Sequence, residues 1–143
     1  YHQALSGELS RLRSLHANVL LWDAHSIRGE IPWLFDGKLP DLNVGTANGL
    51  AAAESVGLAV MEVCSQQEQF THVLNGRFKG GYITRCYGNP QGGIHAVQLE
   101  KCQSVYMNEL PPYEYKPELA AQVQPLLHKM VAAALNQVKS LSL

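Results

Sequence analysis

An apolar run over residues 19–22 ends in a group of polar side chains that includes Asp23, His25 and Arg28. Ligands of open α/β sheets bind beyond the carboxyl ends of the strands, so this pattern predicts a strand that leads into a site. The neutral imidazole of His25 is a candidate metal ligand, and Asp23 is close enough in sequence to orient its ring. The alternative is a histidine hydrogen-bonded at a strand end, without any ligand.

A second group of candidates lies in residues 75–85, which contain three cations and three glycines. Glycine lets a backbone approach a ligand closely, and Arg77 and Arg85 suit bidentate pairing with carboxylates. Asn75 and Lys79 belong to the same segment. A phosphate cradle is disfavoured because the chain contains no GxxxxGK[ST] motif. The alternative is a solvated cationic loop, which is common on protein surfaces.

Glu100 follows a predicted strand over residues 94–99. If that strand is parallel to the strand before His25, both side chains face the same rim of the sheet. Glu100 could then act as a general base toward a water molecule, with burial raising its pKa. The alternative is a glutamate that forms a salt bridge or caps a backbone segment.

Together these features suit hydrolysis of an amide that lies next to carboxylates. A metal would polarise the carbonyl, the glutamate would move a proton from water to the leaving nitrogen, and the arginines would hold the carboxylates. A catalytic zinc usually has three protein ligands, so His25 alone is too few. The other histidines are expected to be structural, in strands (His72, His95), or to lie on helices without metal-binding spacing (His2, His16, His128).

Hydrophobic periodicity places these residues on alternating helices and strands, which predicts a parallel or mixed sheet flanked by helices. The expected helices span residues 1–17, 49–66 and 118–141, and the expected strands span residues 19–23, 71–74 and 94–99. Pro125 should kink or divide the last helix. The irregular segment 27–48 should fold over the site as a lid or wall, or alternatively pack as an Ω-loop. Residues 41–46 within it are expected to form a short edge strand or an extended approach to the next helix.

Composition limits the function classes. The 143 residues are 46% hydrophobic and carry a formal net charge of −1, which argues against partners such as nucleic acid or an anionic membrane. No apolar run is long enough to span a bilayer. Three cysteines at unrelated spacings argue against a disulfide framework and a zinc knuckle, so a cytoplasmic setting is expected. We expect a single α/β domain over residues 1–143.

The same residues resemble the N-formylglutamate amidohydrolase, or N-formylglutamate deformylase, family. The similar motifs cover nearly the whole chain in order: WDAHSIR (22–28), LFDGKLPDLNVGT (34–46), NGRFKGGYITR (75–85) and HAVQLE (95–100). The resemblance implies a zinc-carboxypeptidase-like α/β fold. It also implies metal-dependent hydrolysis of N-formyl-L-glutamate to formate and L-glutamate, in histidine breakdown.

By this resemblance His25 matches a metal-ligand position, and Glu100 occupies the place of the catalytic glutamate of carboxypeptidase-like enzymes. Arg77 and Arg85, with Arg28 as a third candidate, are expected to bind the two carboxylates of the substrate. Lys79 and Asn75 complete the predicted substrate-binding set.

The chain also departs from the family. Members carry an N-terminal portion that should supply the remaining ligands of Zn²⁺ or another divalent metal. We therefore expect the chain to be the C-terminal part of a larger catalytic domain, and to associate with the missing half or with itself. Cys86 stands where the family leads us to expect a histidine, and its thiol is a candidate metal ligand.

Two competing hypotheses remain open. One is a non-catalytic or degenerate binding module for small acidic amino acids, which explains the cationic loop and the shortage of metal ligands equally well. The other is nucleophilic catalysis by a cysteine, although no cysteine has a histidine and an acid at recognisable spacing.

Overall fold

Four strands form one sheet in the order β1-β4-β2-β3 in the computed structural model of the chain, which describes residues 1–142. The strands are β1 (Val19–Ile27), β2 (Leu42–Gly45), β3 (His72–Leu74) and β4 (Ile94–Cys102). β1 is parallel to β4 and β2 is parallel to β3, whereas β2 and β4 are antiparallel. The predicted mixed, mostly parallel sheet is therefore confirmed.

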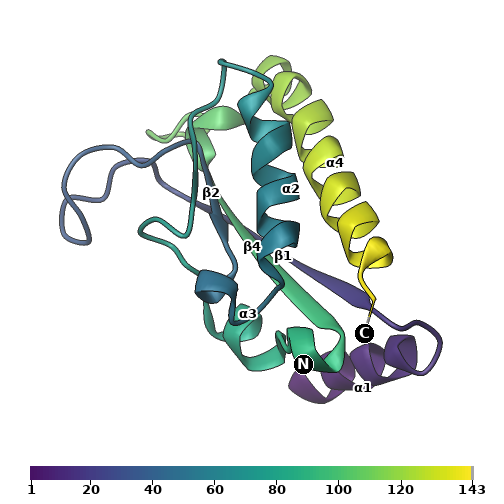
Figure 1. Cartoon of the computed structure of the whole chain (residues 1–143). Helices are drawn as coiled ribbons and strands as arrows, with labels where there is room; N and C mark the ends of the chain where they lie inside the picture. Colours follow the sequence, from purple (N-terminus) through teal and green to yellow (C-terminus); the bar gives the residue numbers. More distant parts are fainter. Residues whose placement is uncertain (143) are drawn as a thin grey trace.

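Helices cover both faces of this sheet. The elements are α1 (His2–Arg13), α2 (Glu54–Ser65), α3 (Tyr82–Tyr87) and α4 (Pro117–Ser140), with short 3₁₀ helices η1 (Ala47–Gly49), η2 (Pro90–Gly92) and η3 (Gln103–Val105). α2 and α4 lie side by side over one face (Figure 1). The short helix α3 contacts β1 and β4.

Alternation along the strands separates the core from a polar face. Leu42 and Val44 of β2 pack with Val97 and Leu99 of β4 in the main hydrophobic cluster, which also holds residues of α2 and α4. Successive side chains of a strand point to opposite faces. The intervening residues of these strands therefore face the other side of the sheet, where α3 lies.

The expectation that residues 41–46 form an edge strand was wrong. β2 lies between β4 and β3, and all four of its residues are buried. A short run that contains Asn43 and Gly45 does not look like an interior strand. Here the Asn43 side chain is satisfied by backbone, because Nδ2 donates to the carbonyl oxygens of Pro40 (2.7 Å) and Glu100 (3.1 Å).

Several predicted boundaries also need correction. The first helix ends at Arg13, the helix predicted from residue 49 begins at Glu54, and α3 was not predicted. β1 and β4 run beyond their predicted ends to Ile27 and Cys102, because the residues that follow each apolar run are still paired in register between the two strands.

The last helix is neither ended nor divided by proline. α4 is continuous from Pro117 to Ser140, with Pro125 inside it. Proline removes the hydrogen bond to the carbonyl four residues earlier. That carbonyl belongs to Ala121, which is exposed, so water can satisfy it.

Within residues 1–142, none of the helices has both the length and the apolar composition needed to cross a membrane.

Met130 gives a test of the core between α4 and the sheet. Its side chain is fully buried in the main cluster. We expect Met130→Ala to lower the free energy of unfolding by about 2–5 kcal/mol, because truncation removes buried contacts and leaves a cavity. Urea unfolding followed by circular dichroism measures this change. Leu58→Ala on exposed α2 surface is the matched control, and equal effects of the two substitutions would contradict this packing.

Candidate active site

His25 and Glu100 are brought together by the register of two parallel strands. In the β1–β4 pair, Asp23 is opposite Gln98 and His25 is opposite Glu100. Residues opposite one another in register project from the same face of a sheet. The predicted convergence of His25 and Glu100 at one rim is therefore present, and it follows from the strands being parallel.

Asp23 orients the His25 ring, as the sequence suggested. His25 Nε2 lies 2.9 Å from Asp23 Oδ1, and Thr84 Oγ1 donates to Asp23 Oδ2 at 3.1 Å. The His25 side chain is 47% exposed, whereas that of Asp23 is 13% exposed. Fully buried Thr84 thus fixes Asp23, which in turn holds the His25 ring through Nε2. Nδ1 is the His25 nitrogen that has no partner among the described residues.

Burial dominates the electrostatics of Glu100. The residue is 8% exposed, and this desolvation raises the pKa of its carboxyl group above the usual 4.5. The nearby charges of His25 and Lys101 act in the opposite direction on that pKa, and Asp23 adds to the rise. A carboxylate with a raised pKa is suited to accept and return a proton near neutral pH.

The glycine-rich segment lies against these strands and borders an open cavity of about 440 Å³. The cavity is lined by His25, Gln98 and Glu100 from the sheet, and by Arg77, Phe78, Lys79, Gly80, Gly81 and Arg85 from the segment and α3. Sequence reasoning thus placed His25, Glu100, Arg77, Lys79 and Arg85 correctly around one hollow. Their individual roles stay predictions.

Backbone contacts dock the segment on the sheet. Gly81 N–H donates to Gln98 Oε1 at 2.5 Å, and Ala47 N–H donates to the Lys79 carbonyl at 2.6 Å. A Cβ on Gly45 would lie 2.6 Å from the carbonyl carbon of Lys79, so only glycine allows this approach. Close contact between two backbones therefore holds the glycine-rich segment beside Glu100.

The cations of the cavity are not neutralised by acidic side chains. Arg77 donates to the carbonyl of Leu34 and lies 5.0 Å from the centroid of the Phe35 ring, and Arg85 donates to the carbonyl of Gly80. Within residues 1–142, Arg77, Lys79 and Arg85 form no salt bridge. The cavity therefore has positive charge available for an anionic ligand.

The segment between β1 and β2 was expected to form a lid or wall over the site, but none of its residues lines the cavity, and it packs behind the lining residues Arg77 and Phe78 instead. Its Phe35 is buried and meets the cavity-lining Phe78 edge to face, with ring centroids 6.5 Å apart. Arg77 also contacts Leu34 and Phe35 of the same segment. Trp33, at 81% exposure, remains outside the packed part of the segment.

Two predicted binding residues lie apart from the cavity lining. The Asn75 amide accepts from the Thr46 N–H at 2.8 Å and donates to Thr46 Oγ1 at 2.9 Å, so it braces the end of β2. Arg28 follows β1, and its Nε is buried without a hydrogen-bond partner among the described residues. Neither residue lines the cavity.

Gln98 and Thr84 were missed by sequence reasoning. Gln98 precedes Glu100 by two residues, so strand alternation places both on one face and could have revealed it. Thr84 gave no comparable signal, because its position depends on the unpredicted helix α3. His95 is structural, as expected, and its Nδ1 accepts from Ala53 N–H at 3.2 Å.

Among the described residues, His25 is suited to be one metal ligand, but these residues do not form a complete metal site. The Asp23–His25 hydrogen bond is the kind of contact that orients a metal-ligating histidine. However, among residues 1–142 no group of three or more histidine, cysteine, aspartate or glutamate side chains could hold an ion. A catalytic zinc needs more ligands than this set offers.

The fold and the cavity define an α/β protein in which a cationic hollow surrounds a buried glutamate. The chain belongs to the N-formylglutamate amidohydrolase family, whose model matches residues 1–107. It is similar to the N-formylglutamate deformylases of Pseudomonas putida, at 52% identity, and Pseudomonas aeruginosa, at 45% identity. Each match covers 94% of this chain and 51% of the relative, so the chain spans about half the length of these curated relatives.

A solved structure supports the fold. The N-formylglutamate amidohydrolase of Ralstonia eutropha JMP134 matches with a TM-score of 0.74 at 19% identity, over 96% of this chain and 49% of that one. The predicted fold class, a zinc-carboxypeptidase-like mixed α/β fold, is confirmed.

Gly45 provides a test of how the glycine-rich segment packs on the sheet. We expect Gly45→Ala to lower the free energy of unfolding by about 1–3 kcal/mol, because the added methyl group meets backbone atoms that cannot rotate away. It should also shift the amide resonances of Gly80 and Gly81. Gly7→Ala is the control, since nothing lies within 4 Å of a Cβ there. Unchanged Gly80 and Gly81 resonances in Gly45→Ala would contradict the contact.

Glu100 gives a pH-dependent prediction. Its pKa is raised in the folded chain, so between about pH 4.5 and this raised pKa the native state holds a proton that the unfolded chain has released. Stability contributed by this group is therefore complete below pH 4.5 and is lost as pH rises through the folded pKa. Glu100→Gln removes this loss.

The variant should consequently gain stability relative to wild type as pH increases from 4 to 7, with the comparison made by urea unfolding at each pH. Glu68→Gln, at an exposed position, serves as the control. A difference between Glu100→Gln and wild type that stays constant across this range would refute the raised pKa.

Proposed function

We propose that this chain carries the proton-transfer and carboxylate-binding part of an enzyme that hydrolyses N-formyl-L-glutamate to formate and L-glutamate. The observation that carries the proposal is that buried Glu100 pairs in register with His25 and shares a cavity with three cations that form no salt bridge within residues 1–142. Family membership and the names of the curated relatives support this choice of substrate.

Each group has a defined task in this proposal. Glu100 accepts a proton from water while the water oxygen bonds to the formyl carbon, and it returns the proton to the nitrogen as the C–N bond breaks. Arg77, Lys79 and Arg85 hold the two carboxylates of the substrate by charge and hydrogen bonds. Holding both reactants in one cavity converts a bimolecular reaction into an effectively unimolecular one.

The metal belongs to the proposal as well. We infer that His25 Nδ1 is one ligand of a divalent ion, zinc being the first choice, and that the other ligands come from the part of the family's length that this chain does not span. The orientation of His25 by Asp23 supports this inference. We also propose a role in histidine breakdown in the cytoplasm, and the three free thiols support a reducing compartment.

Glu100→Gln tests the mechanism in a fusion of this chain to the unmatched half of the Pseudomonas putida relative, joined in that relative's order. Formate release from N-formyl-L-glutamate should fall by about 10²–10⁴-fold in kcat with little change in KM, since the amide cannot accept the proton. Glu68→Gln should leave the rate unchanged.

Near-normal turnover by the Glu100→Gln fusion would overturn the role of Glu100. Calorimetric binding of L-glutamate by the wild-type fusion, without any formate release after addition of zinc, would favour the non-catalytic binding module instead.

A further inference from the structure

The Gln98 side chain lines the cavity with one end of its amide group unpaired. Gln98 is 4% exposed and lies two residues before Glu100 on β4. Its Oε1 accepts from Gly81 N–H at 2.5 Å and from Thr84 Oγ1 at 3.5 Å. Within residues 1–142, no group accepts a hydrogen bond from Gln98 Nε2.

The same contacts determine which end of the Gln98 amide is free. An amide oxygen accepts hydrogen bonds, whereas an amide nitrogen only donates them. A rotated Gln98 amide would place Nε2 against Gly81 N–H, so two donors would face one another. Oε1 is therefore held at Gly81. Nε2 is not among the sealed side-chain atoms that lack a partner in the described residues, so it remains accessible from the cavity.

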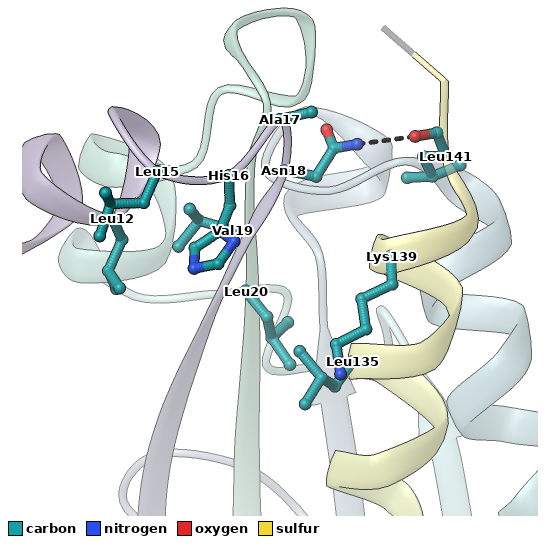
Figure 2. Close-up of a pocket in the computed structure, with 10 residues that line it drawn as sticks. All are labelled: Leu12, Leu15, His16, Ala17, Asn18, Val19, Leu20, Leu135, Lys139 and Leu141. Atoms are coloured by element: carbon teal, nitrogen blue, oxygen red, sulfur yellow. Dashed lines mark hydrogen bonds between the residues drawn. The ribbon is translucent and has the colours of Figure 1, made fainter.

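Asn18 provides a contrast in another hollow of the chain. This hollow of about 490 Å³ lies between α1, the start of β1 and the end of α4, and leucines form much of its lining (Figure 2). Asn18 Nδ2 donates to the Leu141 carbonyl at 2.8 Å, and Asn18 Oδ1 lies 3.4 Å from His95 Nε2. Both ends of that amide are satisfied within the protein. The nearly buried Gln98 donor, in contrast, costs stability unless a ligand or water accepts from it.

A cation lies beside the free donor. Arg85 lines the cavity and donates to the Gly80 carbonyl, and the next residue, Gly81, donates to Gln98. The Arg85 and Gln98 side chains are thus tied to consecutive residues of the glycine-rich segment. A guanidinium group next to a neutral N–H donor suits a carboxylate, whose two oxygens accept several hydrogen bonds.

The spacing along β4 indicates which carboxylate of N-formyl-L-glutamate this pair would bind. Gln98 and Glu100 are separated by about 6.8 Å along the strand. From the substrate nitrogen, the α-carboxyl carbon is about 2.5 Å away, whereas the side-chain carboxyl carbon is about 5 Å away in an extended chain. Since Glu100 returns its proton to that nitrogen in the proposed function, the side-chain carboxylate is the one that reaches Gln98.

We propose that Gln98 is a specificity-determining residue whose Nε2 donates a hydrogen bond to the side-chain carboxylate of the substrate. The identity of the substrate in this inference rests on the proposed function. Gln98→Glu keeps the oxygen that accepts from Gly81 and replaces the donor with a second oxygen. That oxygen repels the side-chain carboxylate of a glutamate derivative but accepts from the side-chain amide of a glutamine derivative.

The preference for N-formyl-L-glutamate over N-formyl-L-glutamine tests this role in the fusion with the Pseudomonas putida half. We expect Gln98→Glu to lower the ratio of the two kcat/KM values by about tenfold or more, mainly through a higher KM for N-formyl-L-glutamate. The cations of the cavity keep the new carboxyl group ionised. Gln91→Glu, at an exposed position outside the cavity lining, is the matched control and should leave the ratio unchanged.

A measurement on the wild-type fusion does not depend on how the variant folds. We expect L-glutamate to shift the NMR resonances of the Gln98 side-chain amide, which are assigned through nuclear Overhauser contacts with Gly81. L-Norvaline has the same carbon chain without the side-chain carboxylate, and it should leave these resonances in place.

An unchanged ratio in Gln98→Glu would overturn the proposal. An equal loss of kcat for both substrates would also overturn it, because Gln98 would then act on the formyl group. So would bound L-glutamate that leaves the Gln98 resonances in place.

The two measurements separate this inference from the proposed function. If L-glutamate shifts the Gln98 resonances but the fusion releases no formate, Gln98 keeps its binding role and the proposed function fails. Formate release with the same ratio in wild type and Gln98→Glu has the opposite meaning. Absence of both glutamate binding and formate release would reject both.

Discussion

The parallel register of β1 and β4 is the constraint on which the site depends. Aligning His25 with Glu100 also aligns Asp23 with Gln98, so two rows of polar side chains lie across one face. Gln98 then accepts from Gly81, and Asp23 accepts from Thr84, which ties the glycine-rich segment and α3 to the same strands. A shift of β4 by one residue would turn Glu100 into the apolar core and remove these contacts together.

The other face supplies the rigidity that this arrangement needs. Val97 and Leu99 alternate with the polar residues of β4 and pack under α2 and α4. The burial that raises the pKa of Glu100 comes from the same strand being central in the sheet. The chemical character of the carboxyl group is therefore a consequence of strand order.

Sequence patterns predicted the parts of this arrangement that are local. The strands before His25 and Glu100 were recognisable because each is an apolar run that leads into polar residues, and the cationic segment because glycine and arginine recur in it. The interior position of β2 and the contact of Thr84 with Asp23 were not predictable, because both depend on which segments meet in space. Asn75 was placed in the binding set by its neighbours in sequence, but its positive φ turns its amide toward Thr46.

Gly45 shows how an absent side chain can limit evolutionary change. The atoms that a Cβ would meet belong to the backbone of Lys79 and Gly80, so no change of side chain in the glycine-rich segment could make room for it. Compensation would require the whole segment to move away from the sheet, and with it the cations that line the cavity. Positions 45 and 79–80 are thus coupled through main-chain atoms, and this coupling leaves no pair of covarying residue types by which an alignment would reveal it.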